Sequence, residues 1–440
     1  IQDAEKARVV YYGTPGQLLF TNIGDTPIRG GISVGDYIYA IHRGTLWEVN
    51  NAGVKTSRGT ITSTSGRVTM TYNGTQIAIV DGTFVGFYVY TIATTTLATV
   101  TTNVIGTPID ITFQDGYGIF GYADGKFQIT SAYAFQTLDA LEYATAESNP
   151  DSLVRVIADH GEVVIAGSMT VEFWGNTGGQ DFPYSNQRGS TLEFGLASPW
   201  SLTKYNDSLA GLFKNRMGQI QVMMMQGHAL RKISSNELDY LINNYSAVSD
   251  ATAYSYMLDG HPMYQISFPS ELKSWLYDGS TDMWSPLESG LSGGRHRGEI
   301  LVDYINKPRV FDYENGNIYT MDADTYTDNG TIIPREITSK HFSSGMDQMA
   351  VHKLQVDFET GVGLISGQGS DPQAMLTYSK DNGHTWSNEA WTTMGAIGAY
   401  LTRAIWRRLG TARDWVFKIR ITDPVKIVIT GASIDATPRK

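Results

Sequence analysis

The chain has 440 residues, carries a formal net charge of −11 and contains no cysteine. This length exceeds one ordinary hydrophobic core, so we expect two or three domains, and the cysteine count excludes disulfides and thiolate metal sites. The acidic balance argues against a protein that grips DNA, because such proteins are usually basic on their working face. No run of about 20 apolar residues occurs, so we expect no membrane span.

Short alternating strands, separated by turns rich in Gly, Asn and Asp, fill residues 31–333. Their hairpin turns lie near residues 43, 81, 124, 167, 216, 270 and 307. A period of roughly 40–50 residues with several short strands in each unit predicts a β-propeller. Seven hairpins leave six or seven blades open, since one hairpin could be an insertion. Residues 1–30 form an N-terminal segment that could complete a blade.

Two segments within this region have helical spacing. In residues 137–147 the apolar residues Leu138, Leu141 and Ala144 recur at helical intervals. In residues 234–246 a Ser and a Glu three positions apart match a capping box before an apolar stripe. Both segments are interpreted as short helical insertions on the rim of the β-fold.

The period is lost after Pro334, and longer strands follow. In residues 417–422, which belong to one of these longer strands, apolar residues alternate with polar ones: Phe417, Ile419 and Ile421 with Lys418, Arg420 and Thr422. Such alternation is typical of a half-buried strand. We therefore expect an all-β chain, with a β-propeller over residues 31–333 and a C-terminal β-sandwich or barrel over residues 334–440.

The segment SKDNGHTW contains an Asp-box, S-x-D-x-G-x-T-W, formed by Ser379, Asp381, Gly383, Thr385 and Trp386. These residue types suit a turn, because the carboxylate can accept N–H bonds within its own loop and Gly tolerates positive φ. Sialidases carry repeated Asp-boxes, and their catalytic groups lie elsewhere. We interpret the single box as a structural turn of the C-terminal domain.

Four further motifs were weighed as sites. The G-x-S-x-G pattern around Ser33 precedes a hairpin, whereas a nucleophile elbow requires a helix. The acidic segment Asp322–Gly330 lacks the EF-hand order. The basic clusters Arg295–Arg297 and Arg403–Arg413 could line a nucleic-acid groove, but the outer face of a hairpin or ion pairs between subunits is the preferred interpretation. We expect no catalytic residue, no metal and no cofactor.

Five longer stretches carry a resemblance to a known family: Leu141–Gly178, Leu230–Pro269, Trp275–Trp284, Tyr313–Phe342 and Gly398–Asp435. They resemble the packaged-DNA stabilisation protein family, which forms the tail hub or nozzle of short-tailed bacteriophages. Family members begin a few dozen residues before a segment like Tyr12–Gly16, which agrees with Ile1 being an internal start.

The resemblance implies a structural virion protein that forms a homohexameric ring below the head-to-tail adaptor. Such a ring carries tail spikes or fibres and is closed by a tail needle or tip protein. It retains packaged double-stranded DNA and conducts it along the axis during ejection, without sequence-specific binding. The protein would be a part of the virion tail, assembled in the bacterial cytoplasm. The sequence assigns no residue to the DNA lumen.

Two alternatives remain open at the level of sequence. One is a propeller-type protein that binds or hydrolyses glycans, and the other is a cytoplasmic propeller scaffold for partner peptides. The 9 Trp and 25 Tyr would suit a sugar site. They would equally suit blade cores and protein interfaces, so they do not discriminate between these functions.

Overall fold

The computed structural model describes residues 10–146, 151–179, 182–291 and 293–439. It divides into two compact units. The propeller unit comprises residues 19–288 and 294–320, and the sandwich unit comprises residues 1–18, 289–293 and 321–440. No helix in the described residues is long and apolar enough to cross a membrane.

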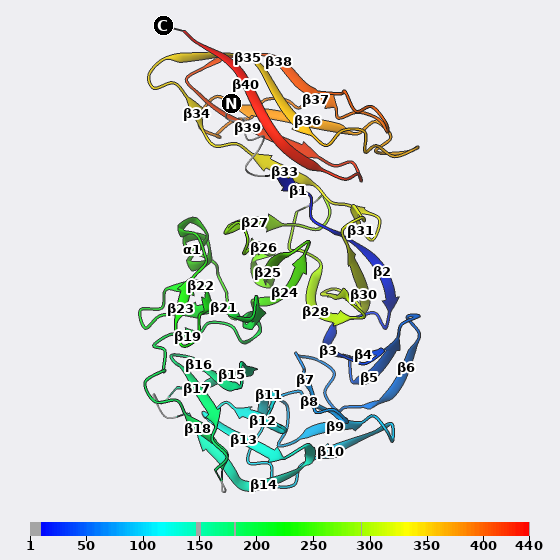
Figure 1. Ribbon diagram of the computed structural model, residues 1–440, viewed down its shortest axis with the longest axis vertical. Helices are drawn as coiled ribbons and strands as arrows, with labels where there is room; N and C mark the ends of the chain where they lie inside the picture. The colour runs from blue at the N-terminus through cyan, green and yellow to red at the C-terminus, as the bar shows by residue number, and fades with distance from the viewer. Residues whose placement is uncertain (1–9, 147–150, 180–181, 292, 440) are drawn as a thin grey trace, which may run out of the picture. The chain divides into compact units, whose positions relative to one another are not determined.

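Seven sheets are arranged around a ring (Figure 1); the strands of six of them pair antiparallel, and the seventh sheet includes one parallel pair. The first three sheets are β3 (Ile28–Val34), β4 (Tyr37–His42), β5 (Thr45–Asn50) and β6 (Lys55–Thr60); β7 (Thr69–Tyr72), β8 (Gln76–Val80), β9 (Phe87–Thr91) and β10 (Thr96–Val100); and β11 (Pro108–Gln114), β12 (Tyr117–Tyr122), β13 (Lys126–Ser131) and β14 (Ala134–Thr145).

The next three sheets continue in chain order. They are β15 (Leu153–Asp159), β16 (Glu162–Gly167), β17 (Val171–Asn176) and β18 (Tyr184–Asn186); β19 (Gly195–Leu196), β20 (Thr203–Tyr205), β21 (Ser208–Lys214), β22 (Ile220–Met225) and β23 (Leu230–Lys232); and β24 (Thr252–Leu258), β25 (His261–Phe268), β26 (Lys273–Asp278) and β27 (Met283–Leu287). Two short 3₁₀ helices, η1 (Pro199–Ser201) and η2 (Pro269–Glu271), lie in the fifth and sixth repeats.

The seventh sheet joins the two ends of the repeat region. It contains β28 (Gly298–Tyr304), β29 (Lys307–Asp312), β30 (Asn317–Asp322) and, beside β30, the N-terminal strand β2 (Gly16–Asn22), with β31 (Thr327–Asp328) and β32 (Thr331–Ile332) beyond it. Each of the seven hairpins read from the sequence therefore lies in a sheet of its own, and the described residues form seven blades.

Apolar residues on both faces of the central strands hold neighbouring blades together. Strand β8, with the sequence QIAIV, is buried over four of its five residues. Its alternate side chains enter two different clusters, so that Ile77 packs toward the first blade and Ala78 toward the third. Another cluster joins Ile38 of the first blade to Phe311 of the seventh, which closes the ring. Burial on both faces explains why β8 has four consecutive apolar residues and does not alternate.

The helix predicted over residues 137–147 is wrong, because residues 134–145 form the long strand β14. Between the pairs Thr130↔Leu138 and Gln128↔Tyr143 the register shifts, so that β14 bulges. Leu138 is buried, whereas Leu141 is 83% exposed. The apolar spacing that imitated a helix thus comes from a bulge, which moves the strand off its two-residue period.

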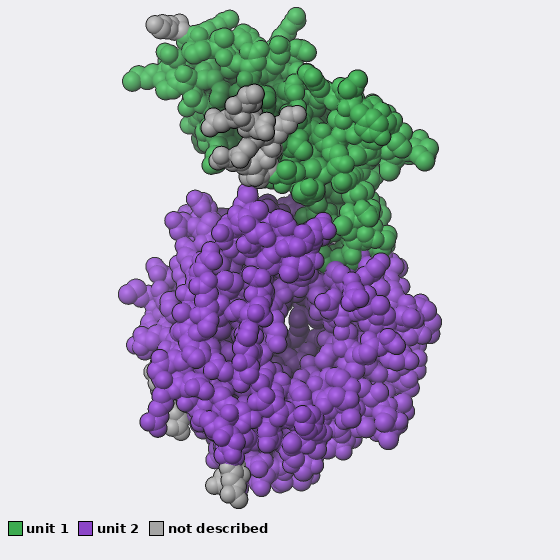
Figure 2. All heavy atoms as spheres, in the orientation of Figure 1, with its two compact units in different colours: residues 1–18, 289–293, 321–440 green, residues 19–288, 294–320 purple. Residues whose placement is uncertain are grey.

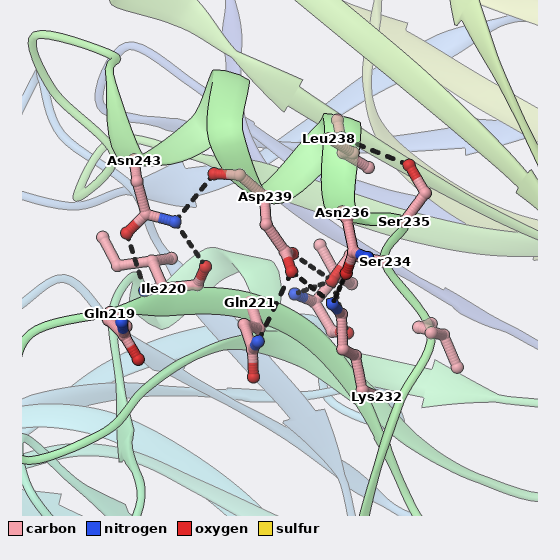
Figure 3. Close-up of polar contacts among 12 residues, drawn as sticks. Gln219, Ile220, Gln221, Lys232, Ser234, Ser235, Asn236, Leu238, Asp239 and Asn243 are labelled. Carbon is pink, nitrogen blue, oxygen red and sulfur yellow. Dashed lines mark hydrogen bonds and ion pairs between the residues drawn. The ribbon is translucent and has the colours of Figure 1, made fainter.

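The second helix prediction is confirmed as α1 (Asn236–Asn243), although Ser235 and not Ser234 caps it. The Ser235 Oγ accepts a hydrogen bond from Leu238 N at 3.2 Å. Figure 3 shows how polar side chains tie α1 to its blade: Asp239 pairs with Lys232 at 2.5 Å, and Asn243 exchanges hydrogen bonds of 2.9 Å with the Ile220 backbone. These contacts fix the helix on strands β22 and β23.

The sandwich unit contains two antiparallel sheets. One consists of β1 (Tyr11–Tyr12), β40 (Val428–Arg439), β35 (Gln348–Phe358) and β38 (Ala404–Ala412); the other consists of β33 (Arg335–Thr338), β39 (Asp414–Ile421), β36 (Gln373–Ser379) and β37 (Ala390–Thr393), with β34 (Phe342–Ser343) paired to β39. Side chains from both sheets form one core, in which Trp415 is fully buried and stacks on Phe417 with ring centroids 5.6 Å apart.

Candidate functional site

A cavity of about 210 Å³ lies on the axis of the propeller unit. Figure 2 shows a hollow on the visible face of this unit. All seven blades contribute to the cavity wall through their innermost strands, and one residue from each is Gly31, Thr69, Asp110, Arg155, Thr203, Tyr254 and Ile300. The cavity is therefore the axial tunnel of the propeller.

Two arginines meet one tryptophan in the wall of this tunnel. The guanidinium carbons of Arg67 and Arg155 lie 5.1 Å and 5.0 Å from the ring centroid of Trp200, which belongs to η1. Arg67 Nη1 also lies 3.5 Å from an oxygen of Glu299. Burial, with a smaller contribution from the charge of Arg155, lowers the pKa of Arg67 to about 10. The Arg67 guanidinium therefore remains charged at neutral pH.

Asp110 is the carboxylate nearest to Arg155 in the tunnel. Its two oxygens accept hydrogen bonds from Ile111 N at 2.9 Å and from Val156 N at 3.0 Å. Arg155 Nε lies 3.8 Å from the second oxygen, which is an ion-pair distance and not a hydrogen bond. Burial raises the pKa of Asp110, and the charge of Arg155 and the backbone donors oppose this rise.

The basic cluster Arg295–Arg297 lies inside the fold, so the interpretation as an outer hairpin face is wrong. Arg295 and His296 are each 7% exposed. Arg295 pairs with Glu299 at 3.0 Å, and its guanidinium lies 3.6 Å from the ring centroid of Tyr313. Because burial and the charge of Arg297 disfavour its protonation, the pKa of His296 is lowered to about 4. The cluster packs the start of the seventh blade.

The Asp-box forms the turn between β36 and β37. The Asp381 carboxylate accepts hydrogen bonds from Thr385 N at 2.8 Å, from the Thr385 hydroxyl at 2.6 Å and from the Ser379 hydroxyl at 2.7 Å. These bonds lower the pKa of Asp381 to about 2. Gly383 has φ of 89°, and the ring of Trp386 lies 4.5 Å from Lys418 Nζ. All three of these hydrogen bonds come from within the Asp-box loop.

The cluster Arg403–Arg413 spans strand β38, in which the alternation between core and solvent is interrupted by a register shift. Trp406 is 4% exposed and donates a hydrogen bond to Ala390 O at 2.7 Å. Arg407 and Arg408 point to solvent. A groove in which Trp406 stacks on a base is thus excluded, because its ring is part of the sandwich core.

The remaining motifs form no site. Ser33 lies in strand β3, and its hydroxyl donates to Asp303 O at 2.5 Å. In the acidic segment, Asp322 accepts a hydrogen bond from Asp324 N at 3.0 Å. Across the described ranges, no three His, Asp or Glu side chains come close enough to hold a metal ion.

The residues of the tunnel wall were missed by the sequence analysis. Arg67 lies two residues before β7 and Arg155 is the third residue of β15, so both precede the hairpin turns that revealed the repeat. A superposition of the repeats on one another could have placed them on the axis. Trp200 follows Pro199 in η1, outside every motif that the sequence singled out.

Two family models cover nearly the whole chain. "Bacteriophage P22 Gp10, beta-propeller" matches residues 6–326, and "Bacteriophage P22 Gp10, beta-sandwich" matches residues 334–437. The chain belongs to the bacteriophage P22 Gp10 family. The family consists of structural phage tail hub proteins and not of enzymes, so the chain is a homologue of a tail hub protein and a component of the virion tail. This result removes the glycan-hydrolase alternative and confirms the predicted fold class.

Known relatives and folds are distant in sequence. The tail hub protein gp10 of Salmonella phage P22 is 23% identical over 299 residues, which are 66% of this chain and 61% of that protein. Among solved structures, the WD40 domain of Toxoplasma gondii coronin is 9% identical, with a TM-score of 0.43, over 71% of this chain and 86% of that one. The WD40 propeller of Doa1 is 13% identical, with a TM-score of 0.44, over 71% of this chain and 97% of that one.

Proposed function

We propose that the chain assembles into a homohexameric ring that retains packaged DNA in the virion and conducts it during ejection. The observation that carries this proposal is the size of the axial tunnel. Its volume of about 210 Å³ is close to that of a cavity of roughly 150 Å³ that holds a single benzene molecule. A DNA duplex cannot enter such a tunnel, so it has to pass between chains.

The charge of the chain supports a conducting role. Duplex DNA carries one negative charge per roughly 1.7 Å of its axis, and a cationic wall would hold it by counterion release. The chain carries a formal net charge of −11 and buries several of its arginines, among them Arg295, which pairs with Glu299. A wall built from such a chain repels phosphate groups, which allows the genome to slide.

The same proposal names the partners and the division of the chain. We expect the ring to contact the head-to-tail adaptor, the tail spikes or fibres and a tail needle or tip protein. We further propose that the N-terminal segment, residues 1–30, completes a propeller blade through β2, while its strand β1 pairs in the sandwich, and that residues 31–333 form the propeller and residues 334–440 the sandwich. The sheet that joins β2 to β28–β30 supports the first of these assignments.

We also propose that the Asp-box is a structural turn. The carboxylate of Asp381 accepts three hydrogen bonds from Thr385 and Ser379, all within its own loop, which supports a role in holding the turn. The sandwich would use this turn to fix the β36–β37 connection.

A DNA-retention assay tests the function. Filled heads of the parent phage are assembled without this protein, and DNase-protected DNA is measured before and after the purified protein is added. We expect heads without the protein to lose their DNA and added protein to restore retention. Heads that keep their DNA equally well in both cases would contradict the proposal.

A further inference from the structure

The axial tunnel contains more cationic donors than anionic acceptors. A guanidinium carries five N–H donors. Arg67 reaches one carboxylate oxygen, at 3.5 Å, and Arg155 reaches Pro199 O at 3.3 Å. The buried Nε of Arg155 has no hydrogen-bond partner. Both side chains are largely buried, with 18% and 19% of their surface exposed.

The two carboxylates nearby are engaged by other groups. Asp110 accepts its hydrogen bonds from the backbone of Ile111 and Val156. Glu299 is shared, since its second oxygen pairs with Arg295 at 3.0 Å. Two guanidinium groups, Arg67 and Arg155, thus line the cavity with one carboxylate, Asp110. The charge of Glu299 is divided between Arg67 and Arg295, so this cluster of three guanidinium groups contains two carboxylates. A buried charge of this kind is costly unless an ion of opposite sign binds beside it.

We propose that the axial tunnel binds one small oxyanion of the size of phosphate, held between Arg67 and Arg155. The volume of about 210 Å³ accommodates such an ion with a few waters. Guanidinium groups bind oxyanions through paired, charge-assisted hydrogen bonds, and the indole of Trp200 keeps both groups in place by cation–π contact. Because Arg67 precedes the second blade, Arg155 belongs to the fourth and Trp200 to the fifth repeat, the anion ties three parts of the ring together.

This site is independent of the path of the genome. The tunnel is too small for a duplex, so phosphate groups of packaged DNA do not reach it. The bound ion is a free oxyanion from solution, and its role is to stabilise the ring of blades. Loss of the site would leave the assembly of chains and the passage of DNA between them intact.

Binding of inorganic phosphate to the full chain tests the proposal. Calorimetric titration at constant ionic strength, with chloride as the balancing anion, gives affinity and stoichiometry. We expect one saturable site per chain in the wild type and at least tenfold weaker binding in Arg67→Met and in Arg155→Met. Arg216→Met is the matched control, because Arg216 is 52% exposed, pairs with Glu193 at 3.1 Å and does not line the cavity. This variant should bind phosphate as the wild type does.

Absence of saturable binding to the wild type would overturn the proposal, as would equal affinity in all four proteins. If the tunnel variants fail to fold, the wild type still decides the question. Its structure is determined in the presence of tungstate, a tetrahedral oxyanion with strong density. Density between Arg67 and Arg155 supports the site, and tungstate bound only elsewhere refutes it.

Discussion

Closure of the seventh blade by the N-terminal segment can be tested with one side-chain substitution, Ile23→Ala. Ile23 follows β2, is 2% exposed and packs in the cluster that joins the first and seventh blades. Its N–H donates to Gly316 O at 2.8 Å, a bond that alanine keeps. The change deletes three carbons, worth about 2.4 kcal/mol of transfer free energy, and the remaining cavity adds about 1 kcal/mol. We expect the free energy of unfolding to fall by about 3–4 kcal/mol.

Urea denaturation measures this loss, and hydrogen exchange shows where it acts. Amides of residues 298–320 should lose protection in Ile23→Ala, because the strand that closes their sheet is loosened. Ile266→Ala is the matched control, since Ile266 is fully buried in the sixth blade, which is built from one continuous segment. Ile266→Ala should instead lower the hydrogen-exchange protection of amides in the sixth blade. A loss below about 0.5 kcal/mol, or equal deprotection of all blades by Ile23→Ala, would refute the closure.

Three further predictions concern single side chains. The pKa of Asp381 is lowered from 3.8 to about 2, so its contribution to the stability of the sandwich is present above pH 4 and is lost as the pH falls toward 2. Asp381→Asn should remove this acid dependence when the free energy of unfolding is measured as a function of pH. The pKa of His296 is lowered from 6.5 to about 4, so as the pH falls the unfolded chain takes up the imidazole proton before the folded chain does. The free energy of unfolding therefore falls as the pH drops from 6.5 to 4. NMR of labelled histidine should show His296 neutral at pH 5.5, and a charged ring at that pH would contradict the burial argument. Trp406→Phe removes the hydrogen bond to Ala390 O and should cost about 1–3 kcal/mol in thermal unfolding, whereas Arg407→Ala should change it by less than about 0.5 kcal/mol.

The repeat of the propeller was readable because each hairpin turn is local in sequence. Turn residues such as Asp124 and Gly125 mark their positions whatever the rest of the fold does. The sandwich was readable for a similar reason, since Phe417, Ile419 and Ile421 alternate on one strand and face one core. Local chemistry thus predicted both units.

Features that depend on distant contacts were not readable. Strand β14 imitates a helix because its bulge is set by pairing with β13, which the spacing of Leu138 and Leu141 does not show. Arg67 and Arg155 are far apart in sequence and meet only when the blades close into a ring. Burial of Trp406 likewise follows from the pairing of β38 with β35, and this pairing changes a candidate base-stacking residue into a core residue.

The central claim is that DNA passes between chains of a ring and not through a propeller. Electron microscopy of the purified chain at high concentration, alone and together with the head-to-tail adaptor, tests it most directly. We expect two-dimensional averages with six-fold symmetry and an open axis wide enough for a duplex. Particles that remain single chains even with the adaptor present, or rings whose axis is closed by protein, would contradict the account.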